Sequence, residues 1–248
     1  MRVATQLKHH TTGLLFLLIV FTAAQHAWPG TESPKEATRD NGLQALVAEG
    51  HHLWTQSPDP SNPVACATCH RDPAKTRGWA ASFPKFKPLP PPHARVMTLL
   101  QANAEAVERH YRLADPLPAA TAITAFLTAQ AAGIPISPGV SAGQPVFPVR
   151  MQALAGSVLR GKHLYASRCG HCHKSFDLAP SATAFPRAEG GRPASLELFL
   201  EGHRPLQPPL AWDGQATADI MAYLTSQAAG QPIGLHTYHA SQEAKEGS

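Results

Sequence analysis

Two short strings, Cys66-Ala67-Thr68-Cys69-His70 and Cys169-Gly170-His171-Cys172-His173, hold all four cysteines of this 248-residue chain. We call them the first and second strings. They lie about a hundred residues apart, and in each of them two residues separate the cysteines and a histidine follows at once. No cysteine remains for a separate disulfide or for a free thiol elsewhere in the sequence.

The spacing inside each string is typical of covalent haem attachment. Two cysteines one helical turn apart match the spacing of the haem vinyl groups, and the adjacent histidine then lies beneath the iron. A zinc ion held by both cysteine pairs and a redox-active disulfide are the alternatives, and both leave the two identically placed histidines unexplained. The residues predicted to hold two covalently bound haem c groups are the thioether-forming Cys66, Cys69, Cys169 and Cys172 and the proximal iron ligands His70 and His173.

The sequence around the strings is repeated. Gly50-His51-His52-Leu53-Trp54 and Gly161-Lys162-His163-Leu164-Tyr165 place a glycine and apolar residues at the same helical spacing before each string. After each string, Ala122–Leu127 matches Asp219–Leu224. Each half of the chain is therefore predicted to contain a helix, a string, a second helix, a loop and a third helix.

Repeated proline between the halves predicts a break in helical structure. Residues 133–152 are rich in proline and glycine, which favours an extended, semi-rigid linker. We therefore expect one domain over 40–132, a second over 153–229 and a polar tail over 230–248. Such small domains with few aromatic residues, 7% of the chain, need a buried group such as haem to supplement their cores.

The first residues predict export. Arg2 and Lys8 precede an apolar stretch over 14–24, as in a secretory signal peptide, which we place at 1–27. The alternative, an uncleaved membrane anchor, needs about 20 apolar residues. A periplasmic protein fits the haem prediction, because bacteria attach haem to such strings on the far side of the membrane. The net charge of +4 comes from scattered basic residues and gives no indication of nucleic-acid binding.

The G-x-x-L-Y pattern or its tryptophan variant, the C-x-x-C-H string and the terminal I-x-A-Y/F-L helix together resemble class I cytochrome c in both halves. The resemblance implies an all-α fold of two tandem class I cytochrome c-like domains, each with roughly three main helices around a covalently bound haem. In most members of this family a methionine before the last helix is the sixth iron ligand. The corresponding stretch of the second half, Gly202–Pro209, contains no methionine.

The sixth iron ligand decides the redox potential of a haem and its access to other ligands. In the second half we expect His203, which ends the helix predicted to cross the distal side of the haem. The pattern Val96–Asn103 of the first half pairs with Leu196–His203 and so aligns Asn103 with His203. His110, in the predicted loop after that helix, is a second candidate for the first haem. The remaining alternatives are Met97, His93 and an open site.

The first half resembles two further haem families. Cys69–Pro73, Lys85–Pro91 and the helix reaching Asn103 are similar to SHP-type monohaem cytochromes, in which an asparagine on this helix is a weak, dissociable ligand. Arg95–Leu99 and Ala125–Gln130 are similar to the haem domains of SoxA-type sulfur-oxidation cytochromes. Those proteins bind the iron through a cysteine on this helix, whereas this chain has no cysteine outside the two strings.

Two functions follow from these features. The first is a periplasmic di-haem c-type cytochrome that passes single electrons between a donor and an acceptor redox protein, either alone or inside a larger complex. No acid–base pair, nucleophile or phosphate loop is visible in the sequence, which favours this carrier. The second is a haem enzyme or gas-binding protein with an open or labile distal site in the first domain, for oxygen, nitric oxide or sulfur-compound chemistry. We expect redox proteins as partners, no nucleic acid, and a membrane contact only through an uncleaved signal anchor.

Overall fold

The computed structural model describes residues 34–90, 94–173, 187–189, 192–203 and 206–234. The predicted signal peptide, His93 and most of the predicted tail lie outside the described residues. Residues 33–248 form one compact unit. Among the described helices, none is both long enough and apolar enough to span a membrane.

The first half of the chain is mostly helical, as expected. A long helix, α1 (Pro34–Thr55), leads to the short helices α2 (Cys66–Cys69) and α3 (Pro73–Thr76) and to a 3-10 turn, η1 (Ala80–Ser82). Two antiparallel strands come next, and two longer helices follow them. These elements are β1 (Lys85–Lys87), β2 (Arg95–Met97), α4 (Leu99–Tyr111) and α5 (Leu117–Gln130).

The second half repeats this order of elements. The long helix α6 (Pro148–Arg168) ends at the second string, and the antiparallel strands β3 (Arg187–Glu189) and β4 (Arg192–Ala194) follow. Helices α8 (Leu196–Gly202) and α9 (Gln215–Gln227) come last. The two short hairpins are the elements that the sequence analysis did not predict, because strands of three residues carry too little alternation to recognise.

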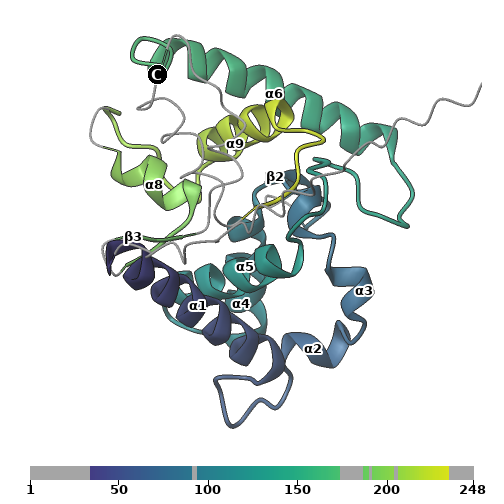
Figure 1. Ribbon diagram of the computed structural model, residues 1–248. Coiled ribbons are helices and arrows are strands. Elements are labelled where there is room, and N and C mark those ends of the chain that lie inside the picture. The colour runs from purple at the N-terminus through teal and green to yellow at the C-terminus, as the bar shows by residue number, and fades with distance from the viewer. Residues whose placement is uncertain (1–33, 91–93, 174–186, 190–191, 204–205, 235–248) are drawn as a thin grey trace, which may run out of the picture. The chain divides into compact units, whose positions relative to one another are not determined.

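In each half the first and last long helices cross at a glycine. Helix α1 packs on α5 and α6 packs on α9 (Figure 1). A Cβ atom at Gly50 would lie 2.0 Å from the carbonyl oxygen of Ala122, and one at Gly161 would lie 1.8 Å from that of Asp219. Only glycine allows two backbones to come this close. Both glycines therefore have the same role, in agreement with the alignment of the two halves.

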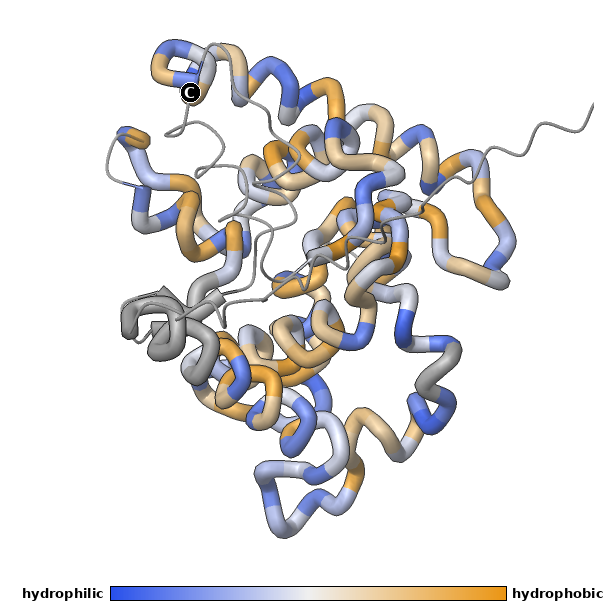
Figure 2. The backbone as a smooth tube through the Cα atoms, viewed as in Figure 1, coloured by the Kyte–Doolittle hydropathy of each residue, from blue (hydrophilic) through white to orange (hydrophobic). Residues whose placement is uncertain are grey.

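Helix α5 is the centre of the larger core. Its residues from Ala119 to Thr128 are buried, and its backbone is coloured mainly as apolar in Figure 2. Trp54, Leu100 and Val107 pack in the same cluster. The described part of the second half has a smaller cluster, whose buried members are Leu196, Leu200, Leu206, Leu210, Ile220 and Leu224.

Matching helix caps correct one part of the alignment. Thr98 caps α4 and Ser195 caps α8, each accepting a hydrogen bond from the N–H three residues on, at 3.2 and 3.3 Å. Ala122 and Asp219, whose carbonyls lie at the two crossings, are separated by the same number of residues as Thr98 and Ser195. We use this separation to align α4 and α5 with α8 and α9. It pairs His203 with Ala106, so the predicted alignment of Asn103 with His203 is wrong by about one helical turn. A helix repeats its apolar face every turn, and a one-turn shift therefore preserves the apolar pattern on which that alignment rested.

Each hairpin packs against the other half of the chain. The β1–β2 hairpin contacts α6 and α9, whereas the β3–β4 hairpin contacts α1 (Figure 1). Val96 of β2 is buried in a cluster with Leu154 of α6 and Ala222 of α9. Part of the apolar surface of the second half is therefore covered by the first half.

The segments that follow α5 and α9 form a seam between the halves. Residues 128–136 and 225–233 share the pattern T-x-Q-A-A-G-x-P-I. The N–H of Gly133 donates to the carbonyl of Ile233 at 2.8 Å, and the N–H of Ile233 donates to the carbonyl of Ile134 at 3.0 Å. Ile136 and Ile233 are buried in one apolar cluster. The first residues of the predicted linker and of the predicted tail thus pack together.

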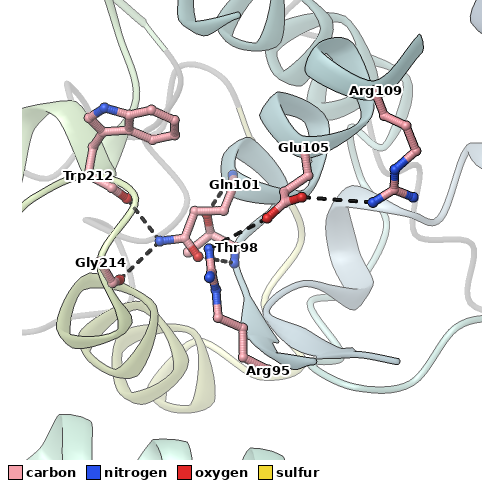
Figure 3. A network of polar contacts seen from close by, with 7 residues as sticks. All are labelled: Arg95, Thr98, Gln101, Glu105, Arg109, Trp212 and Gly214. Carbon is pink, nitrogen blue, oxygen red and sulfur yellow. Dashed lines mark hydrogen bonds and ion pairs between the residues drawn. The ribbon is translucent and has the colours of Figure 1, made fainter. Parts of the chain in front are cut away.

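A buried amide also joins the halves. Nε2 of Gln101 donates to the carbonyl oxygens of Trp212 and Gly214, at 2.9 and 3.1 Å, while its Oε1 accepts from the N–H of Thr98 at 3.2 Å (Figure 3). Gln101 is 2% exposed, so these bonds satisfy an amide that water does not reach. The same view shows a looser ion pair of 3.8 Å between Arg109 and Glu105.

The glycine crossing predicts opposite effects for two alanine substitutions in α6. Gly161→Ala should lower the free energy of unfolding by about 3 kcal/mol, because its Cβ meets backbone that cannot move aside. The control is Gly156→Ala, whose Cβ would meet only the end of the Arg160 side chain at 3.5 Å and which should gain about 0.5 kcal/mol. Denaturant unfolding of the haem-loaded protein measures both. Equal effects of the two substitutions would contradict the crossing.

The Gln101 contacts predict that Gln101→Ala costs about 2 kcal/mol, because both carbonyls lose a donor across the halves. Arg109→Ala, in the same network, should change stability by less than about 0.5 kcal/mol, because its side chain is 51% exposed and its ion pair with Glu105 is long, at 3.8 Å. Thermal and denaturant unfolding of both variants check the difference. If Arg109→Ala lowered the free energy of unfolding as much as Gln101→Ala, burial would not explain the difference in strength between these contacts.

Candidate functional site

The first string forms one helical turn beside a cavity. The N–H of His70 donates to the carbonyl of Cys66 at 2.9 Å, which closes the turn that α2 begins. Cys69 and His70 line a cavity of about 770 Å³. The imidazole of His70 contacts two tryptophans that also contact each other, with its ring centroid 5.9 Å from that of Trp54 and 4.8 Å from that of Trp79. These rings fix the imidazole at the edge of the cavity.

The surroundings of His70 favour its neutral form. Partial desolvation is the largest cause of a lowered pKa for this histidine, and the electrostatic effects of Lys87 and then His110 act in the same direction. A neutral imidazole is the form that binds a metal ion. A neutral His70 would suit its predicted role as the proximal ligand of an iron.

Tyr111 holds the start of the first string. Its hydroxyl donates to the carbonyl of Leu53 at 2.5 Å and accepts from the N–H of Cys66 at 3.2 Å, and the sulfur of Cys66 lies 3.2 Å from the same oxygen. Burial raises the pKa of the Tyr111 hydroxyl and of the Cys66 thiol. Tyr111 thus ties the ends of α1 and α4 to the string. The sequence analysis did not single it out, because one aromatic residue at the end of a helix carries no signal before the helices are placed.

Helix α4 lines the same cavity as His70 through Leu99, Ala102, Asn103 and Ala106. Asn103 lies there with its Nδ2 donating to Oγ1 of Thr124 at 2.8 Å, and Ala106 lies one turn further along the helix. Met151, from α6 of the second half, is the one methionine among the described lining residues. Met151 could be found only from the structure, because the sequence places it beside the linker and far from the first string.

Neither His110 nor Met97 lines this cavity. His110 lies in the last turn of α4, which continues to Tyr111, and not in a loop after the helix as expected. Its side chain is exposed. Met97 belongs to β2 and is fully buried in the core. His93 lies outside the described residues.

The second string also forms a single turn, at the end of α6. The N–H groups of Cys172 and His173 both donate to the carbonyl of Cys169, at 3.1 and 3.0 Å. Across from the string, His203 follows the last residue of α8 and caps that helix. The ring centroids of His173 and His203 are 6.5 Å apart, and the ring of Phe199 lies 5.1 Å from that of His203.

The separation of these two imidazoles fits a metal ion between them. A bond from a metal to an imidazole nitrogen is about 2 Å long and the ring centre lies about 1 Å beyond the nitrogen, so two histidines on opposite sides of one iron have centroids roughly 6 Å apart. The observed 6.5 Å agrees with that value. Both side chains are half-buried. The described residues of the second half therefore fit a haem with two histidine ligands.

The zinc and disulfide alternatives receive no support from the positions of the cysteines. No disulfide joins any of the four cysteines. Among the residues that the structure describes, no group of three or more His, Cys, Asp and Glu side chains is arranged to hold a metal ion.

Comparisons with known proteins give one informative likeness. No protein-family model and no curated protein matches this sequence. Among solved structures, the crystal structure of SoxXA from P. pantotrophus contains a chain that is 16% identical and superposes with a TM-score of 0.60. The match covers 78% of this chain and 77% of that chain. At this identity the likeness shows the fold alone, and the fold is cytochrome c-like and mostly helical.

Tyr111→Phe tests whether this hydroxyl positions the first string. We expect a loss of about 1–2 kcal/mol, because a buried carbonyl and a buried N–H lose their partner, and less complete haem attachment at Cys66. Mass spectrometry of the purified protein measures haem attached to each string. Tyr223→Phe, whose ring packs against Tyr165 in the second half, is the control and should leave the first string fully loaded. Equal loading of both variants would rule out a positioning role for Tyr111.

Proposed function

We propose that this chain is a periplasmic di-haem c-type cytochrome that transfers single electrons between redox proteins. The observation that carries this proposal is the pair His173 and His203, whose ring centroids lie 6.5 Å apart beside the second string. When bound, haem supplies a one-electron redox couple at its iron. Two histidines that hold the iron on both sides leave no position for a substrate, as suits a carrier.

The residues of each string have the same roles in both halves. Cys66 and Cys69 would hold the first haem, and Cys169 and Cys172 the second, through thioethers. His70 and His173 would be the proximal ligands, already oriented by the turn that each string forms. The predicted signal peptide at 1–27 and the periplasmic location belong to the proposal, because haem is attached to such strings after export.

The two haem sites differ on the distal side. His203 corresponds to Ala106, whose side chain has no atom that can bind iron and which lines the 770 Å³ cavity. Asn103 and Met151 are the described lining residues that offer a weak oxygen or a thioether ligand to the first haem. We therefore infer that the two haems differ. The haem of the second half would pass electrons on, whereas the iron of the first haem would have a weak sixth ligand or none.

This difference supports one alternative function, a haem enzyme or gas-binding protein. In that case the first haem would bind oxygen, nitric oxide or a sulfur compound in the cavity, and the second would supply electrons. Redox proteins remain the expected partners under both functions. Binding of carbon monoxide by the reduced protein distinguishes them, because a carrier with two six-coordinate haems does not bind it.

His203→Ala tests the second site. The wild-type second haem should be low-spin, whereas the variant should gain a high-spin ferric signal and bind carbon monoxide, because the iron loses its sixth ligand. Absorption and electron-spin resonance spectra of the exported, haem-loaded protein measure this. His163→Ala, an exposed histidine of α6, is the control. An unchanged low-spin spectrum in His203→Ala would contradict ligation by His203.

Ala106→His tests the proposed difference between the halves. A histidine at this position should convert the first haem to a low-spin form and abolish any carbon monoxide binding there. Glu108→His, on the exposed side of α4, should leave the first haem unchanged. If the wild-type first haem already refuses carbon monoxide and Ala106→His changes nothing, the gas-binding alternative is wrong. A methionine-type charge-transfer band that disappears in Met151→Leu would identify Met151 as its sixth ligand.

A further inference from the structure

The cavity beside the first string is lined by an excess of positive charge. One carboxylate, Asp72, is among the described lining residues, and it forms an exposed ion pair of 3.8 Å with Lys75. Five basic side chains line the cavity: Arg71, Lys75, Lys85, Lys87 and Arg150.

Three of these cations belong to two elements that come from different halves. Lys85 and Lys87 lie on β1, half-buried, and Arg150 lies in the first turn of α6 at the exposed rim. Nζ of Lys85 donates to the hydroxyls of Ser82 and Ser141, at 2.9 and 3.1 Å, and lies 4.4 Å from the centre of the Phe83 ring. Lys85 is thus held in one place by neutral groups.

No carboxylate compensates these three cations. In the described part of the chain, no Asp or Glu lies within ion-pair distance of Lys85, Lys87 or Arg150. Burial, followed by the cations of Lys87 and Arg150, lowers the pKa of Lys85 to about 8. A half-buried cation among other cations is costly, and proteins compensate such a charge with an anion. The arrangement therefore needs an anionic ligand.

We propose that Lys85, Lys87 and Arg150 bind the two propionate carboxylates of the haem attached to the first string. The inference rests on the proposed function, because it requires that haem. The cations line the same cavity as Cys69 and His70. A haem held by this string therefore lies within reach of the basic cluster.

The position of Lys85 favours the carboxylates of a resident cofactor over a free anion. Each time a small anion dissociated, the site would again contain three cations that repel one another. A covalently attached haem keeps its carboxylates in place permanently, and so compensates the cluster in every state of the protein. Carboxylates paired with lysine and arginine also form strong, charge-assisted hydrogen bonds.

The test compares Lys85→Gln, Lys87→Gln and Arg150→Gln in the full, haem-loaded chain. Resonance Raman spectra report the propionate bending modes, and potentiometric titration reports the midpoint potential of the first haem. We expect the bending mode to shift in Lys85→Gln and Lys87→Gln, and the potential to become more negative, because the oxidised, more positive haem is favoured when a cation is removed. Lys85→Arg should restore both values.

Lys75→Gln is the matched control, because Lys75 lines the same cavity but is 79% exposed and already paired with Asp72. It should leave the propionate mode of the first haem unchanged. If Lys85→Gln does not load haem, Lys87→Gln and Lys85→Arg provide the same comparison.

Two outcomes would overturn the inference. One is a normally loaded first haem whose propionate mode is the same in the wild type and in all three glutamine variants. The other is saturable binding of sulfate or sulfite to the wild type, at constant ionic strength, that shifts the first haem spectrum and is lost in Lys85→Gln. The second outcome would assign the cluster to a free anion. A failure of the proposed function would be recognised separately. In that case the wild-type protein would carry no haem on the first string, before any variant is compared.

Discussion

The contact of two helix backbones at a glycine, made once in each half, is the constraint on which the rest of the structure depends. Gly50 and Gly161 let α1 and α6 lie directly on the carbonyls of Ala122 and Asp219. The second string begins directly after α6, the helix that carries Gly161, so the crossing also fixes where that string starts, whereas the first string begins at Cys66, beyond the end of α1 at Thr55. The start of the second string is therefore positioned by main-chain contact before any side chain of the site is considered.

The second half strengthens this crossing with polar contacts. Asp219 accepts hydrogen bonds from Ser157 at 2.5 Å and from Arg160 at 2.7 and 2.8 Å, and Gln215 donates to it at 2.9 Å. The hydrogen bond with Asp219 raises the pKa of Arg160. The Asp219 side chain is 4% exposed and that of Arg160 is 55% exposed, so the buried charge is compensated from the surface. In the first half Ala122 occupies the same place within a larger apolar core, which makes such contacts unnecessary.

The sequence predicted what depends on local spacing. The strings, the long helices and the glycines were identified because cysteine spacing and helical periodicity act over a few residues. The register of α4 was missed because a shift of one turn leaves an apolar helix face almost unchanged, and this led to the comparison of Asn103 with His203. Tyr111 and Met151 were missed for another reason. Each reaches the first site from a segment that is remote from the string in sequence, and only the packed helices bring it there.

The packing of the halves changes how the predicted linker is understood. Proline and glycine at 133–152 predicted a semi-rigid connection between separate domains, yet Ile134 and Ile136 pair with the segment after α9. The β1–β2 hairpin also completes its core with residues of α6 and α9. Because β1 carries Lys85 and Lys87 while α6 supplies Arg150 and Met151, the cavity of the first string is built by both halves. The two halves therefore share a backbone plan but differ around their strings: the long helices and hairpins are repeated, whereas the surroundings of each string are completed by different neighbours.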